Sequence, residues 1–155
     1  PNCQVTVLDN SPTMLALAKT RVSSTFKGEV HFYKEDATKF PFPFEMFDAV
    51  VTHFFLDCFT EETLSALLEK LSSTLRSGGK WLIADFVEPS PNTLHSIPQF
   101  LCLRILYVFF RLTCGIEARS VISPHKILRT LGLYESRSIS FSKGFLTSLV
   151  FIKQA

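Results

Sequence analysis

The chain has 155 residues, of which 46% are hydrophobic and 19% are charged, and its formal net charge is +2. This composition excludes a disordered chain, and the length is that of one domain with a buried core. The small net charge and the scattered basic residues give no reason to expect nucleic-acid binding.

The four cysteines, Cys3, Cys58, Cys102 and Cys114, lie far apart and form no Cys-x-x-Cys pair. Such spacing is typical neither of a zinc site nor of a disulfide framework. The N-terminal residues also lack the pattern of a secretory signal. We therefore expect a reducing, cytoplasmic compartment.

Short strand-like runs alternate with helix-length periodic runs, which is typical of an α/β fold with parallel strands. A strand is predicted over 4–8, followed by a helix that Ser11 caps and Pro12 opens. A second strand is predicted over 30–34. The proline-rich segment 40–44 is predicted to be a loop, because proline cannot donate to a strand ladder.

Residues 47–53 form an apolar run typical of a buried strand. Thr60 is predicted to cap a helix that ends at 76–79, where a basic residue and two glycines occur. A strand over 80–86 follows, and Asp85 lies near its carboxyl end. The helix carries one apolar stripe, made of Leu64, Leu67, Leu68, Leu71 and Leu75.

Residues 94–114 predict a long apolar helix, which Arg104 and Arg111 interrupt. Two arginines disfavour a membrane-spanning helix. Three interpretations stay open: a lid over an apolar substrate, an interfacial helix whose arginines meet lipid headgroups, or an edge that dimerises.

A short helix over 123–131 and a closing hairpin follow. The hairpin strands are predicted over 134–141 and 146–153.

Four segments occur in an order and spacing that resemble the class I S-adenosylmethionine-dependent methyltransferases. They are Val5-Thr-Val-Leu-Asp9, Glu35-Asp-Ala37, Phe47-Asp-Ala-Val-Val-Thr-His53 and Leu75-Arg-Ser-Gly-Gly-Lys-Trp-Leu-Ile-Ala-Asp85. The resemblance implies an α/β fold with a Rossmann-like methyltransferase sheet, mostly parallel with an antiparallel C-terminal hairpin. Residues 1–155 are then one partial methyltransferase-like domain, with 94–131 as a helical lid-like insertion.

The sequence departs from this family in one respect. The family's first strand and its Gly-x-Gly-x-Gly turn, which holds the amino-acid part of the cofactor, do not occur in the chain. In the family that strand lies between the strands that here end at Asp9 and His53. The chain must therefore leave a gap, pair those two strands directly, or borrow a strand. We expect an N-terminally truncated domain that carries the fold without full activity.

The resemblance implies S-adenosylmethionine as the cofactor and assigns its contacts. Asp9 corresponds to the carboxylate that binds the ribose hydroxyls, and Asn10 and Met14 line the adenosine pocket. Asp36 corresponds to the acceptor for the adenine amino group, and the Ala37 amide faces the ring. The alternatives are a helix-capping acid at Asp9, a core residue at Met14 and a solvated turn at Asp36.

Thr52, His53 and Phe54 come at the end of the fourth family strand, next to the transferable methyl group. His53 is a candidate catalytic base, although we favour a role in shaping the site. Phe54 offers an aromatic wall to the cationic sulfonium, or is ordinary core. No metal is expected, because His53, Asp57 and Cys58 lack an evident further ligand.

By the same resemblance, the insertion covers the acceptor site, and we favour the lid among the three interpretations of the apolar helix. The candidate lid residues are Phe100, Leu103 and Tyr107.

Together these inferences predict methyl transfer to a small, apolar molecule. Two alternatives stay open. One is a dinucleotide-dependent oxidoreductase; the other is a non-catalytic methyltransferase-like module whose helix 94–114 docks on a partner or on a membrane surface. The oligomeric state is left open.

Overall fold

The structure is a computed structural model, and it describes residues 3–22, 24–87, 101, 105, 123–142 and 145–154. The chain divides into two compact units, Pro1–Pro41 and Phe42–Ala155, each with its own sheet. Most of the predicted insertion 94–131 lies outside the described residues, including the candidate lid residues Phe100, Leu103 and Tyr107.

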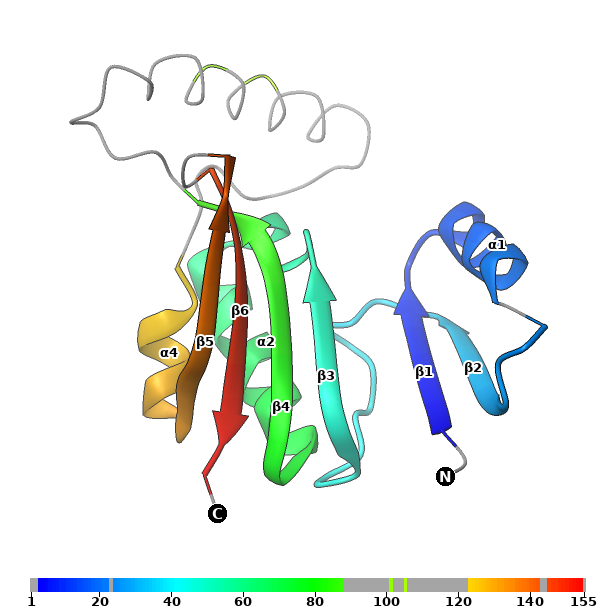
Figure 1. The fold of residues 1–155 in the computed structure, drawn as a ribbon, viewed down its shortest axis with the longest axis horizontal. Helices are drawn as coiled ribbons and strands as arrows, with labels where there is room; N and C mark the ends of the chain where they lie inside the picture. The colour runs from blue at the N-terminus through cyan, green and yellow to red at the C-terminus, as the bar shows by residue number, and fades with distance from the viewer. Residues whose placement is uncertain are drawn as a thin grey trace. The chain divides into compact units, whose positions relative to one another are not determined.

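The first unit contains two parallel strands and one helix (Figure 1). They are β1 (Cys3–Asp9), α1 (Pro12–Arg21) and β2 (Gly28–Lys34). The predicted cap of α1 is confirmed, because the Ser11 hydroxyl accepts a hydrogen bond from the Met14 N–H at 3.3 Å. The cap satisfies one of the N–H groups that have no partner within the helix.

The second unit contains a four-stranded sheet in the order β3-β4-β6-β5. Its elements are β3 (Phe47–His53), the 3-10 helix η1 (Leu56–Cys58), α2 (Glu61–Thr74), β4 (Leu75–Phe86), α4 (His125–Thr130), β5 (Leu133–Phe141) and β6 (Leu146–Lys153). The strands β3 and β4 are parallel, and β4, β6 and β5 pair antiparallel. The predicted closing hairpin is confirmed; its turn at 143–144 lies outside the described residues.

The core of the second unit forms between α2 and the sheet. All five leucines of the predicted stripe are buried. They lie in the same core as Trp81, Ile83 and Phe151, which are at most 1% exposed. Helices α2 and α4 lie on the same face of the sheet (Figure 1). His125 ties α4 to the hairpin, because its Nε2 lies 3.2 Å from the Glu135 carboxylate and its ring contacts that of Phe151.

The boundary between α2 and β4 differs from the prediction. The helix ends at Thr74, and the strand begins at once with Leu75 instead of after a glycine cap at 76–79. Leu75 is fully buried and pairs with Phe47 at the start of β3. The register then shifts before Lys80, and Gly78 has a φ of +76°. Gly78 therefore lies in an irregular segment of β4 instead of in a helix cap. Both positions can require a positive φ, which glycine adopts without steric cost.

The two sheets show how the strands that end at Asp9 and His53 are paired. Among the described strands, β1 pairs with β2 alone, and β3 pairs with β4 alone. The strands that end at Asp9 and His53 are thus not hydrogen-bonded neighbours. Of the three outcomes that the sequence allows, direct pairing of these two strands does not occur in the described residues.

The leucine stripe of α2 should dominate the stability of the second unit. Leu68 is 0% exposed, whereas Leu82 on β4 is 36% exposed. We expect Leu68→Ala to lower the free energy of unfolding by about 2–5 kcal/mol, because it removes a buried side chain and leaves a cavity. Leu82→Ala is the matched control, and urea denaturation measures both. Equal losses for the two variants would contradict this assignment of the core.

Candidate functional site

Asp9 is the last residue of β1, and a local turn fixes its carboxylate. Its Oδ1 accepts a hydrogen bond from the Ser11 N–H at 2.7 Å. Within the described residues no hydrogen bond engages Oδ2. This bond closes the turn that leads into α1, whose N-cap is Ser11, and it leaves the other oxygen available to a ligand. A carboxylate accepts through both oxygens, so the two roles are compatible.

Asn10 and Met14, the other two residues predicted for the adenosine pocket, follow Asp9 in the chain. Asn10 is exposed, and the Met14 side chain is 53% exposed. The buried residue of α1 is Leu15 instead. The alternative that Met14 is a core residue is therefore wrong for this unit, and its side chain leaves apolar surface uncovered near Asp9.

Asp36 organises the turn that follows β2. Its Oδ1 accepts hydrogen bonds from the Thr38 hydroxyl at 2.7 Å and from the Thr38 N–H at 2.9 Å. These two bonds, chiefly that of the hydroxyl, hold the pKa of Asp36 below its usual range, so the group is ionised at neutral pH. Lys39 lies 3.6 Å from Oδ2. Ala37 lies inside the turn, which the Lys39 N–H closes on the Asp36 carbonyl at 3.0 Å.

The two acids share one edge of the first unit. Asp9 is in register with Lys34, and Asp36 follows Lys34 by two residues. Because β1 and β2 are parallel, both carboxylates lie at the carboxyl ends of their strands. This is the edge of parallel sheets at which ligands bind in α/β proteins.

In the second unit, the predicted residues at the end of β3 point in different directions. Thr52 is 6% exposed, and its hydroxyl accepts a hydrogen bond from Trp81 Nε1 at 3.0 Å. That hydroxyl belongs to the core. His53 is exposed, and Phe54 is 50% exposed. The structure therefore leaves His53 and Phe54, but not the Thr52 hydroxyl, accessible at this end of the strand.

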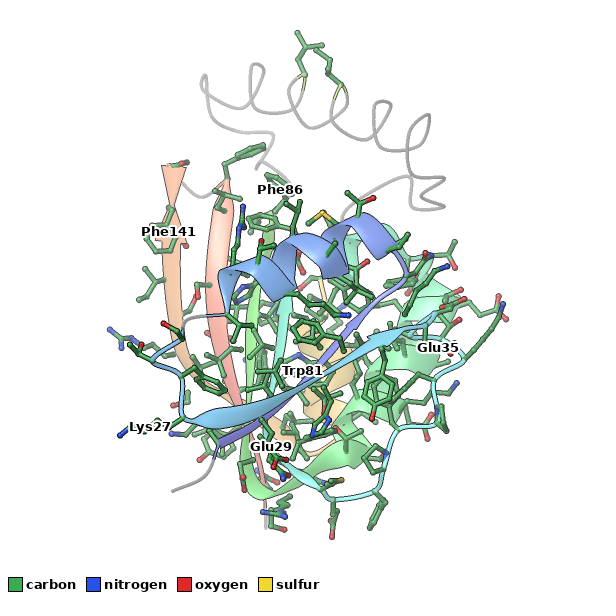
Figure 2. The ribbon with its side chains drawn as sticks, turned by 90° about the vertical axis from the view of Figure 1, so that its right-hand side faces the viewer. Lys27, Glu29, Glu35, Trp81, Phe86 and Phe141 are labelled. Carbon is green, nitrogen blue, oxygen red and sulfur yellow. The ribbon has the colours of Figure 1, made fainter. Side chains whose placement is uncertain are left out.

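Phe54 has an unusual backbone conformation, with a φ of +50°. This region is uncommon for a bulky side chain. The Phe54 N–H donates to the Ala84 carbonyl at 2.7 Å. Its ring lies 5.1 Å from that of Phe86, which in turn lies 5.3 Å from that of Phe145. Figure 2 shows Phe86 at the end of β4, beyond Trp81. These three rings form the aromatic row of the carboxyl edge.

Asp85 is the functional candidate to which the sequence assigned no role. It is 7% exposed, and its Oδ1 is buried with no hydrogen-bonding partner among the described residues. Burial, and then the neighbouring Asp57 carboxylate, raise the pKa of Asp85 to about 7, against opposing hydrogen bonds from the N–H groups of Phe55, Leu56 and Phe54. Perturbed acids of this kind cluster at functional sites. The available signal was an acid near the carboxyl end of a strand parallel to β3.

Within the part of the chain that the structure describes, no three His, Cys, Asp or Glu side chains are grouped so that they could hold a metal ion. In the same part, no helix is long and apolar enough to cross a membrane.

Comparison with known proteins identifies the class. Residues 1–79 match the family described as a methyltransferase domain, which is just over half of the chain. The ubiquinone/menaquinone biosynthesis C-methyltransferase UbiE of Pseudomonas aeruginosa is 32% identical over 97 residues. The match covers 61% of this chain and 36% of that protein. The chain thus spans little more than a third of the length of such relatives.

Solved structures give the same fold. A putative methyltransferase from Bacillus halodurans has a TM-score of 0.71 at 14% identity, with 99% of this chain and 84% of that chain covered. A SAM-dependent methyltransferase from Methanosarcina mazei has a TM-score of 0.67 at 16% identity, with 97% and 82% covered. This chain belongs to the class I S-adenosylmethionine-dependent methyltransferase family, and the Rossmann-like fold class is confirmed. The family's cofactor is S-adenosylmethionine.

The raised pKa of Asp85 makes stability depend on pH. Because the folded protein keeps this proton up to about pH 7, while the unfolded chain loses it near 3.8, stability falls as pH rises through this interval. Asp85→Asn removes the titration. We expect the variant to gain roughly 2–4 kcal/mol on the wild type between about pH 4 and about pH 8. Urea denaturation across this range measures the difference, and Asp48→Asn, an exposed acid on β3, is the control. Parallel curves for wild type and Asp85→Asn would contradict the assignment.

Proposed function

We propose that this chain takes part in methyl transfer from S-adenosylmethionine to a small, apolar acceptor. The supporting observation is the pair of acids at one edge of the first unit. Asp9 and Asp36 each have Oδ1 fixed by a local turn, and Oδ2 of Asp9 makes no hydrogen bond within the described residues. The cofactor of the family contains an adenosine group, and carboxylates placed in this way can accept hydrogen bonds from such a group.

The residues of the first unit fit the adenosine part of the cofactor. The carboxylate of Asp9 would accept hydrogen bonds from the ribose hydroxyls, and that of Asp36 from the adenine amino group. Met14 would cover the base with its exposed apolar side chain. The chain contains no Gly-x-Gly-x-Gly turn for the amino-acid part. We therefore assign the adenosine half of the site to this unit and leave the other half unassigned.

The carboxyl edge of the second unit, considered by itself, has features that suit methyl-transfer chemistry. When bound, S-adenosylmethionine supplies a methyl group on a positively charged sulfur, which becomes a thioether when the acceptor takes the methyl. The aromatic row of Phe54, Phe86 and Phe145 offers a surface that excludes water and suits a cation. His53 would shape the acceptor site, or take the proton that the acceptor loses.

Two features favour an apolar acceptor. The aromatic row is one, since Phe54 is 50% exposed. The other is the name of the UbiE relatives, which places them in quinone biosynthesis as C-methyltransferases. The insertion 94–131 would close over such an acceptor with Phe100, Leu103 and Tyr107.

A second candidate is a non-catalytic module. In the described part of the chain, β1 and β3 each have one edge without a partner strand. Such an edge is a template for pairing with another chain. In this case the apolar segment 94–114 would dock on a partner or on a membrane surface. Size-exclusion chromatography and co-sedimentation with liposomes separate this candidate from the enzyme, since a lipid-indifferent monomer contradicts it.

Cofactor binding tests the first proposal. We expect S-adenosylhomocysteine to bind in isothermal titration, and Asp9→Ala to weaken binding by about tenfold or more, because it removes charge-assisted hydrogen bonds. Glu29→Ala is the matched control, since Glu29 lies in the same unit at the opposite end of β2. It should bind like the wild type.

Three results would count against the proposal. The first is no heat from S-adenosylhomocysteine with a folded protein, and the second is equal binding by Asp9→Ala and the wild type. The third is tighter binding of a nicotinamide dinucleotide than of S-adenosylhomocysteine, which would favour the oxidoreductase.

A further inference from the structure

The backbone of the turn that follows β2 is held by several contacts of its own. The Asp36 carbonyl accepts hydrogen bonds from the Lys39 N–H and from the Phe40 N–H, both at 3.0 Å. The Phe40 ring also contacts the Tyr33 ring edge-to-face, with 5.3 Å between the ring centroids. The Thr38 hydroxyl takes part in none of these contacts.

The Thr38 hydroxyl is instead bonded to the Asp36 side chain. It donates to Oδ1 at 2.7 Å, and the Thr38 N–H donates to the same oxygen at 2.9 Å. A backbone N–H on a carboxylate oxygen is enough to form an Asx turn. The hydroxyl bond is therefore an addition to a turn that is already closed, and two donors on one oxygen fix the orientation of the carboxylate.

The other oxygen of the Asp36 carboxylate remains accessible from solvent. The Asp36 side chain is 42% exposed, and Lys39 Nζ lies 3.6 Å from Oδ2 on a side chain that is 82% exposed. An ion pair that is solvated to this extent contributes little. The amino group of a ligand can therefore share Oδ2 with Lys39. Because Asp36 is ionised at neutral pH, its carboxylate accepts hydrogen bonds and donates none.

We propose that Thr38 is a positioning residue of the first unit, whose hydroxyl orients the Asp36 carboxylate so that the unit selects adenine against hypoxanthine. This role rests on the proposed function, which assigns the adenine amino group to Asp36. Hypoxanthine carries an oxo group in place of that amino group. The amino group donates to an ionised carboxylate, whereas the oxo group presents a second acceptor to it. Two facing acceptors form no hydrogen bond, so the oxo base binds more weakly.

Three variants separate the Thr38 hydroxyl from the rest of the residue. Thr38→Val removes the hydroxyl and keeps both the shape of the side chain and the backbone N–H that bonds to Asp36. Thr38→Ser keeps the hydroxyl and is the conservative variant. Thr20→Val is the matched control, because the Thr20 hydroxyl donates to the Leu17 carbonyl at 2.7 Å within α1 of the same unit.

The first experiment needs no ligand. The carboxyl resonance of Asp36 is followed by NMR from about pH 3 to about pH 6, the range around the ordinary pKa of an aspartate. The Thr38 hydroxyl is the largest cause of the lowered pKa of Asp36, and the Thr38 N–H and Lys39 also contribute to it. We therefore expect Thr38→Val to raise this pKa, and Thr38→Ser and Thr20→Val to leave it low. An unchanged pKa in Thr38→Val overturns the proposal.

The second experiment measures selectivity by isothermal titration at about pH 7. The two ligands are S-adenosylhomocysteine and S-inosylhomocysteine, its counterpart with hypoxanthine as the base. We expect the wild type to prefer the adenine ligand by about tenfold or more, the effect of one hydrogen bond to a charged group. Thr38→Val should reduce this preference by roughly three- to tenfold, because the carboxylate loses its fixed orientation. Thr38→Ser and Thr20→Val should keep it.

The ratio of the two affinities distinguishes this role from a structural one. A residue that only stabilises the turn would weaken both ligands equally when it is replaced. An equal preference in Thr38→Val and in the wild type overturns the positioning role and leaves the proposed function intact. Absence of binding of either ligand to the folded wild type, with Asp36 titrating as expected, contradicts the proposed function and with it the assignment of adenine to Asp36.

Discussion

The parallel pairing of strands is the constraint on which the whole candidate site depends. In each unit the first two strands run in the same direction, so their carboxyl ends meet at one edge. The first unit thereby brings Asp9 and Asp36 to a common edge. The second brings His53, Phe54 and Asp85 together through the pairing of His53 with Ala84. An antiparallel pair would place the corresponding residues at opposite ends.

The pattern of apolar residues predicted most of this scaffold. The strand over 47–53 and the leucine stripe occur where the pattern predicts them. The stripe is buried as expected, whereas in the strand only Val50 and Thr52 are buried and Val51 is 56% exposed. The boundary at Leu75 was missed for a physical reason. A basic residue and two glycines are typical of a helix end. In the structure, however, Leu75 is buried and pairs with Phe47 as the first residue of a strand. Tertiary packing therefore outweighs the local preference at this boundary.

The candidate site was less predictable than the scaffold. The sequence located Asp9 and Asp36, since an acid after a strand is visible as a pattern. It could not show that one oxygen of Asp9 closes the turn before α1 while the other makes no hydrogen bond within the described residues. It gave no role to Asp85, because the burial of this carboxyl group and its proximity to Asp57 arise from tertiary contacts. Likewise, nothing in the sequence around Phe54 indicates the left-handed backbone conformation of this residue.

The balance of interactions at Asp85 suggests why an acid stands there. An apolar residue of similar size would fill the space without an orphaned oxygen, and an asparagine would bring no charge. The aspartate is 7% exposed, and its Oδ1 has no partner in the described part of the chain. Burial, and then the neighbouring Asp57 carboxylate, raise its pKa to about 7. Because buried acids with such shifted pKa values cluster at functional sites, Asp85 is a candidate for a role in the site as well as in the fold.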